Sequence, residues 1–395
     1  MPRPAREAFP APALITNSAD LAALCDRLAR ETFVTVDTEF MRERTYWPEL
    51  CVVQLAGTDE VAVVDAEVPG IDLAPLGRLL ADPAVVKVFH AARQDVEIFV
   101  QLFGAPPVPL FDTQIAAMVA GFGDQVGYDA LVGGLTGGHI DKAHRFSDWS
   151  ARPLSPAQVT YAAADVTHLR RVYEALCEKL TKGDRLSWVA EEQAELADPA
   201  LYKPDPERLW ERLRPRTTNR RMLGVLRAMV AWREREAQRA NVPRQRIVKD
   251  ETLLELAATA PTTADELGRA RGITRGFAEG KMGTGLMAAI ASAKALPEDA
   301  LPDAGNGRDG PKPSPALVSL LKVLLAAACE RHDVAPRLVA SSDDIERLAT
   351  EDAPDVPALH GWRETVFGHD ARELKAGRIA LGVDGRRVKL LRAGA

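Results

Sequence analysis

Four carboxylates and one tyrosine, in three short blocks, are the residues of this sequence best suited to joint chemistry. Asp37 and Glu39 lie in an apolar, β-branched run, and side chains two apart on a strand project from the same face. Asp95 forms the second block. Tyr161 and Asp165 are four residues apart in a helical stretch, so they share one helix face. Clustered carboxylates repel one another, and hard oxygen ligands suit Mg²⁺ or Mn²⁺, so the blocks predict a divalent-metal site.

The elements that must position these residues alternate between strands and helices. Apolar, β-branched runs bounded by turn residues predict strands at 33–37, 51–56, 61–65 and 85–89. Helical patterns follow Ser18 and occupy 73–80, 95–103 and most of 112–180, with a break at 133–141. Three consecutive strands followed by strand–helix alternation indicate an α/β domain with a mixed sheet flanked by helices.

Two interruptions divide the remaining chain, and 395 residues are enough for more than one domain. Three prolines break the helical pattern at 196–210, and a stretch rich in Pro, Gly and Asp at 295–315 has the composition of a linker. The tail 379–392 alternates like a strand, although the segment before it reads as helical. We expect a catalytic domain at 1–205, a helical domain at 206–296, a linker at 297–315 and a last domain at 316–395.

The three blocks resemble, in order and wording, the motifs of the DEDD family of 3′–5′ exonucleases. A tyrosine four residues before the last aspartate matches the tyrosine-bearing subclass, and the intervening stretches are most similar to the ribonuclease D family. These stretches read DTEFMRERTYWPELCVVQLAG, FHAARQDVEIF, FDTQIAAMVAGFG and YAAADV, within a resemblance that covers roughly residues 15 to 182. The resemblance implies a ribonuclease H-like fold for the catalytic domain.

The same resemblance implies a role for each residue of the three blocks. Asp37 would bridge two divalent ions, Mg²⁺ or Mn²⁺, while Glu39 and Asp165 would complete the site that holds the attacking water. Asp95 would support the second ion through water. Two ions about 3.5–4 Å apart stabilise both the attacking and the leaving oxygen of an in-line displacement at phosphorus. Tyr161 has an ordinary pKa near 10, so orienting the water is a better role for it than acting as a free base.

The helical segment after the catalytic domain is similar to the HRDC domain, a small module found in helicases and in ribonuclease D. The features that carry this similarity are the AWREREAQ helix and the VPRQRIVKDETLLELA and DELGRARGITRGFAEG turns. Residues 316–395 look like a second, degenerate copy. The expected architecture is therefore a ribonuclease H-like domain followed by two small all-α HRDC-like domains.

Further residues are candidates for holding the substrate. Arginines with interleaved aromatics suit a single strand, because the guanidinium binds phosphate and the ring stacks on a base. A lysine in HIDKAHRFSDW occupies a place where ribonuclease D also tends to have one, and a histidine ends the strand before the second block. Each of these has an alternative structural explanation, as a loop residue or a hydrogen-bonding partner. The candidates are Arg42, Arg44, Tyr46, Trp47, His90 and Lys142. Asp112, by contrast, has the setting of a helix N-cap.

Composition and charge limit the possible classes of function. The four cysteines are scattered without a CxxC pair, which excludes a zinc site of that type and favours a reducing compartment. No GKS or GKT sequence marks a P-loop, and no apolar run has the length of a membrane span. The net charge of −6 conceals a basic region, because residues 207–296 carry 18 Lys and Arg against 10 Asp and Glu. A basic region beside an acidic catalytic domain suits an enzyme that acts on a polyanion.

These observations predict a metal-dependent 3′–5′ exoribonuclease that releases nucleoside 5′-monophosphates. The family implies RNA 3′ ends as the partner, in particular transfer RNA precursors and other small structured RNAs. We expect a cytoplasmic monomer without a membrane partner. Two alternatives stay open: a 3′–5′ exonuclease that acts mainly on DNA, because the metal chemistry does not read the 2′-hydroxyl, and a catalytically silent RNA-binding protein.

Overall fold

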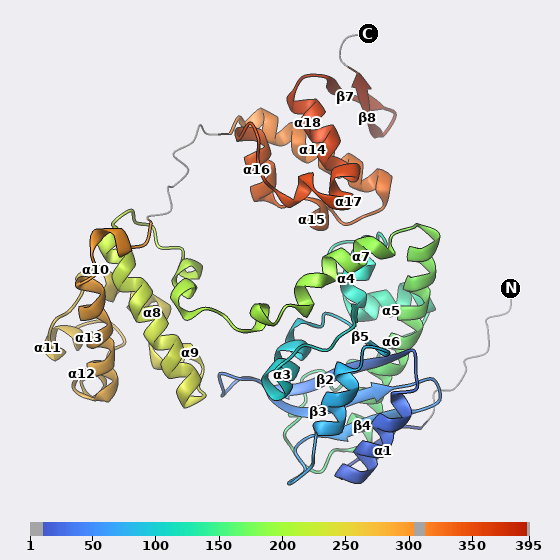
Figure 1. Cartoon of the computed structure of the whole chain (residues 1–395), viewed down its shortest axis with the longest axis horizontal. Helices are drawn as coiled ribbons and strands as arrows, with labels where there is room; N and C mark the ends of the chain where they lie inside the picture. Colours follow the sequence, from blue (N-terminus) through green and yellow to red (C-terminus); the bar gives the residue numbers. More distant parts are fainter. Residues whose placement is uncertain (1–10, 304–312, 393–395) are drawn as a thin grey trace. The chain divides into compact units, whose positions relative to one another are not determined.

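A computed structural model describes residues 11–303 and 313–392 of the protein (Figure 1). The chain forms two compact units. Of the described residues, one unit contains 11–39, 50–199 and 313–392, and the other contains 40–49 and 200–303. The loop at 40–49, which follows the first acidic pair, thus belongs to the same unit as the middle helical segment. Each unit is considered by itself below.

A six-stranded sheet with strand order β1-β4-β3-β2-β5-β6 forms the framework of the first unit. Its strands β1 and β4, β2 and β5, and β5 and β6 pair in parallel, whereas β3 and β4 pair antiparallel. The predicted mixed sheet is therefore confirmed, and β2 extends four residues beyond its predicted end. The short strands β1 and β6 are absent from the prediction. The strands are β1 (Ala13–Ile15), β2 (Phe33–Met41), β3 (Glu49–Ala56), β4 (Val61–Asp65), β5 (Val86–Phe89) and β6 (Leu110–Asp112).

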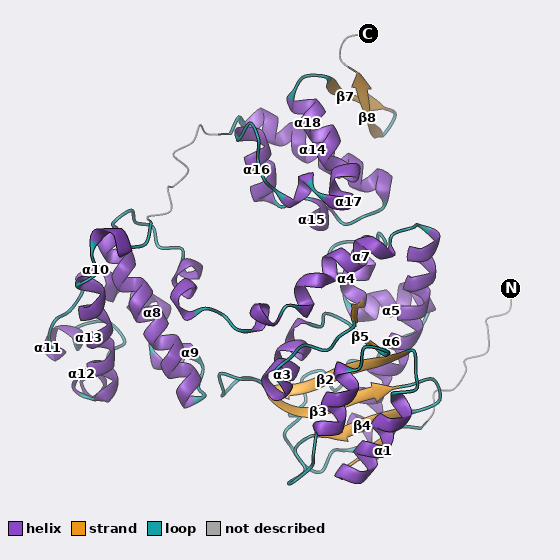
Figure 2. Ribbon diagram, viewed as in Figure 1, coloured by secondary structure: helices purple, strands orange, loops and turns teal. Residues whose placement is uncertain are grey.

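Helices flank this sheet (Figure 2). The longest, α6, has 27 residues and begins at a capping box in which Ser155 and Gln158 bond to each other's backbone N–H groups. Pro156 occupies its first turn, where a missing N–H costs nothing. The helices of this domain are α1 (Ser18–Leu28), α2 (Ala74–Ala81), α3 (Arg93–Phe103), α4 (Thr113–Val119), α5 (Tyr128–Thr136), α6 (Pro156–Lys182) and α7 (Leu186–Gln193), followed by the short turn η1 (Ala194–Ala197).

The second unit is helical, with a core between α8, α10 and α13 that contains Leu226, Leu253 and Leu286, all completely buried. Residues 297–303 belong to this unit and pack on its helix α8, because Leu301 is buried and Arg220 donates to its carbonyl oxygen at 2.9 Å. The first part of the predicted linker is therefore folded, and its part at 304–312 lies outside the described residues. The elements are η2 (Pro199–Tyr202), η3 (Pro206–Leu213), α8 (Arg220–Ala240), α9 (Arg244–Ile247), α10 (Asp250–Thr259), α11 (Ala264–Leu267), α12 (Arg275–Glu279), α13 (Lys281–Lys294) and η4 (Glu298–Ala300).

The last domain packs on the catalytic domain within the first unit. Trp362 stacks on Trp188 with ring centroids 4.6 Å apart, and Arg363 pairs with Glu191 at 3.1 Å. The expectation of an all-α domain is wrong here, because the alternating tail forms a β-hairpin on the helices. The elements are α14 (Pro315–His332), α15 (Pro336–Val339), α16 (Ser342–Thr350), η5 (Pro357–Leu359), α17 (Gly361–Arg363), η6 (Glu364–Gly368), α18 (His369–Lys375), β7 (Ile379–Asp384) and β8 (Arg387–Arg392).

Among the described residues, no helix combines the length and the apolar character that crossing a membrane requires.

Candidate active site

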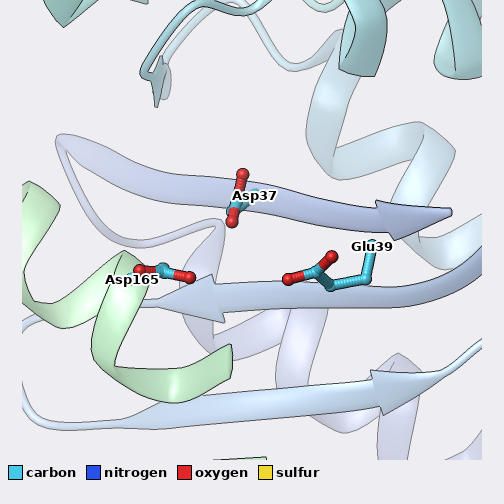
Figure 3. Close-up of side chains that lie close together, drawn as sticks. All are labelled: Asp37, Glu39 and Asp165. Carbon is cyan, nitrogen blue, oxygen red and sulfur yellow. The ribbon is translucent and has the colours of Figure 1, made fainter. Parts of the chain in front are cut away.

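Strand β2 and helix α6 bring three of the predicted carboxylates together. Asp37 and Glu39 project from β2, and Asp165 projects from the first half of α6, with the carboxyl groups of Glu39 and Asp165 directed toward one another (Figure 3). The Thr35 hydroxyl, on the same face of β2, donates to the Val166 carbonyl at 2.8 Å and fixes the helix over this face. One carboxylate oxygen from each acid lies within 4.8 Å of the others. The periodicity of each element therefore sets the direction in which its acids project, and the contact between β2 and α6 brings the three acids together.

No lysine or arginine among the described residues forms an ion pair with these three acids, and the electrostatics of the cluster reflect this. Burial raises the pKa of Glu39 to about 9, with repulsion from Asp37, Asp165 and Asp95 adding to the effect. Burial also raises the pKa of Asp165 to about 7. The pKa of Asp37 is raised by burial and then by Asp165. Three oxygen ligands at this spacing fit a hard divalent ion.

Asp95 lies beside this cluster and is not one of the three acids within 4.8 Å of one another. Its Oδ1 accepts a short hydrogen bond from the hydroxyl of Thr38, which projects from the opposite face of β2. Burial and the charge of Asp37 raise its pKa, although its place in the first turn of α3 favours a negative charge. The structure thus brings Asp95 near the site with one oxygen already engaged.

Asp112 caps a helix, as predicted, and also makes hydrogen bonds that the sequence did not indicate. The N-cap is confirmed, because its Oδ1 accepts from the Gln114 N–H at 2.8 Å. The same buried carboxylate also accepts from the N–H groups of Ala91 and Ala92, at 3.0 and 2.9 Å. Ala91 has a φ of 58°, a left-handed conformation that a non-glycine residue adopts only at a cost. Asp112 therefore stabilises the turn between β5 and α3, from which Asp95 projects.

Tyr161 lies one helical turn before Asp165 and is half-buried, with the ring of Trp149 at 6.1 Å and that of His144 at 6.0 Å. Burial, followed by the charges of Asp165, Glu39 and Asp37, raises its pKa above the ordinary value. Its hydroxyl consequently stays protonated at neutral pH. In this environment the group can donate a hydrogen bond.

A cavity of about 360 Å³ opens over Asp37, Asp165 and Tyr161. Several residues of its lining were not predicted from the sequence, and Tyr128 and Gln114 are two of them. The Tyr128 hydroxyl donates a short hydrogen bond to the Asp165 carbonyl, and Gln114 follows the Asp112 cap. Tyr128 begins α5 in a plain GYDAL stretch, so no sequence signal pointed to it.

Two predicted substrate-binding residues also line this cavity. His90 contacts Thr113 Oγ1 at 3.0 Å, and burial lowers its pKa to about 4, so the imidazole is neutral at physiological pH. Lys142 lies at the rim, where its ammonium group pairs with Asp129 at 2.7 Å. Both partners of this pair are about half-exposed, so the pair contributes little energy and exchanges readily.

The remaining predicted substrate-binding residues belong to the loop at 40–49. Tyr46 is buried, and its hydroxyl donates a short hydrogen bond to Glu234 of α8, while Asn241 accepts from the Tyr46 and Trp47 N–H groups at 3.2 and 3.1 Å. The expectation that Tyr46 stacks on a base is therefore wrong for this structure, because its ring is covered. Trp47 is half-buried with its ring 4.7 Å from that of Tyr46. Of the four candidates in this loop, Arg42 and Arg44 are exposed.

Family models match two separate parts of the chain, the domain that contains the six-stranded sheet and the helical second unit. A model of the 3′–5′ exonuclease family matches residues 12–181. A model of the HRDC domain matches residues 222–290, within the second unit.

Curated relatives match the whole chain. The Ribonuclease D of Gluconacetobacter diazotrophicus is 69% identical over 393 residues, which cover 100% of both chains. That of Acidiphilium cryptum is 63% identical over 383 residues, covering 97% of this chain and 98% of its own. Among solved structures, Escherichia coli RNase D, described as an exoribonuclease involved in structured RNA processing, is 30% identical with a TM-score of 0.77. It covers 93% of this chain and 98% of its own.

Proposed function

The chain belongs to the ribonuclease D family of 3′–5′ exoribonucleases, and from this premise we propose that it trims RNA 3′ ends by two-metal-ion hydrolysis. The observation that carries the proposal is the group of Asp37, Glu39 and Asp165, with one oxygen of each within 4.8 Å of the others, beside a cavity that Asp37 and Asp165 line. No basic residue of the described chain neutralises them. The unbalanced negative charge supports cation binding, and the adjacent cavity supports binding of a nucleotide at the same place.

Asp37, Glu39 and Asp165 would hold the metal ions, and Asp95, beside them, would support one of these ions. Two divalent ions, when bound, supply charge stabilisation for the attacking and leaving oxygens of the phosphodiester. The raised pKa values of the acids support this assignment, because a bound cation favours the carboxylate form that burial disfavours. Either Mg²⁺ or Mn²⁺ fits the all-oxygen donor set.

The protein's own side chains would orient the reactants. The protonated Tyr161 hydroxyl would donate a hydrogen bond and so hold the attacking water or a phosphate oxygen in line. Lys142 would leave Asp129 to bind a phosphate, an exchange of one weak half-exposed partner for a stronger one. Neutral His90 would offer hydrogen bonds and no charge, which suits a sugar hydroxyl or a base edge better than a phosphate.

The substrates we propose are RNA 3′ ends, in particular those of transfer RNA precursors and other small structured RNAs. The HRDC domain adds basic surface, but several of its arginines serve the fold, since Arg221 donates to the Leu296 carbonyl at 2.5 Å and Arg244 pairs with Glu234 at 2.8 Å. Arg246 and Lys249 stay exposed and can contact phosphates. We further propose a cytoplasmic monomer, which agrees with four free cysteines.

The decisive experiment is incubation of the full chain with 5′-labelled single-stranded RNA and DNA of equal sequence, with Mg²⁺ or Mn²⁺ and with EDTA. We expect a ladder of RNA shortened from the 3′ end, 5′-monophosphate products and no reaction in EDTA. Asp37→Asn should abolish turnover in a folded protein, whereas the exposed Asp124→Asn should leave it unchanged. Faster cleavage of DNA would show the deoxyribonuclease alternative, and metal-independent RNA binding without cleavage would show the silent one.

A further inference from the structure

The hairpin formed by β7 and β8, which we call the basic hairpin (residues 379–392), has a packed base and a free tip. Its strands pair antiparallel with Leu381 opposite Leu390 and Val383 opposite Val388. Leu381 and Leu390 pack against the core of the last domain. Val383 and Val388, farther along the same face, are 76% and 37% exposed. The helices thus anchor the hairpin at its base, and the tip extends past the core.

The charge of the basic hairpin is opposite to that of the domain that carries it. Its 14 residues include four Lys and Arg and a single Asp, whereas residues 316–378 include eight Lys and Arg and eleven Asp and Glu. Arg386 and Arg387 at the tip are exposed and form no ion pair within the described ranges 11–303 and 313–392. Lys389 reaches Asp384 only at 3.4 Å, with both side chains largely exposed. The positive charge at the tip is therefore available to a partner.

The residue types at the tip identify the kind of partner. Guanidinium groups bind phosphate oxygens in a bidentate manner, so paired exposed arginines suit a polyphosphate backbone. The basic hairpin contains no aromatic residue, so it lacks the stacking platform on which proteins bind unpaired bases. Double-helical RNA is instead recognised through its shape, its phosphates and its 2′-hydroxyls across a wide, shallow minor groove.

We propose that the basic hairpin binds the sugar–phosphate backbone of a double-helical segment in the RNA substrate. This inference rests on the proposed function, because it assigns RNA as the ligand of a second site on the same enzyme. Arg386 and Arg387 contact phosphates, and Val383 and Val388 pack against the sugar edge. The catalytic cavity takes the unpaired 3′ end, while the hairpin holds the stem.

A second explanation for these charges is that they protect the free edges of a two-stranded sheet from pairing with other chains. Glutamate serves that purpose as well as arginine does, whereas RNA binding needs a positive charge. The double variant Arg386→Glu/Arg387→Glu separates the two explanations, since it keeps the edges charged and reverses their attraction for phosphate. The variant Lys322→Glu/Arg337→Glu is the matched control, because both residues are exposed in the same domain and the charge change is equal.

The affinity of each full-length protein for an RNA stem-loop with a single-stranded 3′ tail is measured in EDTA between 0.05 and about 0.5 M salt. Two lost phosphate contacts should remove roughly 1.8 from the log–log salt slope and about 30-fold from the affinity at ~0.15 M salt. The control should bind as the wild type does, and a short unstructured oligonucleotide should bind equally to all three. Equal stem affinities and equal slopes for the tip variant and the wild type would overturn the proposal.

Two further measurements keep this result separate from the fate of the proposed function. Thermal melting and Mg²⁺-dependent cleavage of the short oligonucleotide should be unchanged in the tip variant, and Arg386→Gln/Arg387→Gln replaces it if the glutamate variant fails to fold. Absence of cleavage by the wild type would refute the catalytic assignment alone, because stem binding in EDTA does not require turnover. A general loss of binding to both RNAs by the tip variant would also overturn the stem-specific role.

Discussion

Replacing Asp165 with asparagine should stabilise the metal-free protein while it abolishes activity. Burial raises the pKa of this carboxyl from 3.8 to about 7, so ionising it in the folded protein is unfavourable. Each pKa unit corresponds to about 1.36 kcal/mol, which gives about 4 kcal/mol above pH 7. Water entering the cavity lowers this figure, and we expect about 2 kcal/mol for Asp165→Asn. Among the described residues, none donates a hydrogen bond to the Asp165 carboxylate, so the substitution loses no such bond to offset the gain in stability.

The effect has a defined dependence on pH. Below the unfolded pKa near 3.8 the carboxyl is protonated in both states, and the penalty is absent. Between pH 3.8 and about 7 the folded state holds a proton that the unfolded state has lost, so wild-type stability falls as pH rises. Above about pH 7 the penalty is complete. The advantage of Asp165→Asn over the wild type should therefore be full at pH 8 and roughly half of that at pH 5.5.

Differential scanning calorimetry in EDTA at pH 5.5 and pH 8 measures this difference. A gain of about 2 kcal/mol in a domain of this size raises Tm by roughly 4–8 °C. Mg²⁺ or Mn²⁺ should raise the Tm of the wild type at pH 8 and have less effect on the variant, because a ligand of the ion is gone. Asp124→Asn, at an exposed position, should change neither value. A variant that melts below the wild type at pH 8 would refute this account of the acidic cluster.

Three other substitutions test separate parts of the structure. Tyr161→Phe keeps the ring and removes the hydroxyl, so kcat on a short RNA should fall by about 10²–10⁴-fold with unchanged Tm, and an unchanged kcat would assign Tyr161 a packing role alone. Lys87→Met should lower the free energy of unfolding by about 3 kcal/mol, because the ammonium group of this completely buried residue donates to three backbone carbonyls at 2.6–2.7 Å. Thermal melting checks this, with circular dichroism to show that the secondary structure is intact. Glu234→Gln should lower the free energy of unfolding by on the order of 3 kcal/mol, because it leaves Arg244 and the Tyr46 hydroxyl without a charged partner. A variant that melts at the wild-type temperature in calorimetry would contradict this.

The local geometry of the site follows from the sequence. A strand repeats every two residues and a helix every 3.6, so Asp37 with Glu39 and Tyr161 with Asp165 had to share faces wherever their elements lay. Capping by Ser155 and Asp112 was equally local, since each side chain bonds to N–H groups two or three residues ahead. The family could also be inferred from the sequence, because the order and spacing of the three motifs can be read from the chain without its structure.

Contacts between distant segments had to come from the tertiary structure. Tyr46 resembled an exposed base-stacking residue, but its partner Glu234 lies 188 residues away, so no local pattern revealed its burial. Strand β1 has three residues, too few for a period of two to be recognised, and it becomes a strand only by pairing with β4. The hydrogen bond from the Thr38 hydroxyl to one oxygen of Asp95 also joins segments far apart in the chain, so no local pattern predicted it. Periodicity determines which side chains share a face, whereas burial and hydrogen-bond partners depend on which faces meet, and only the folded chain decides that.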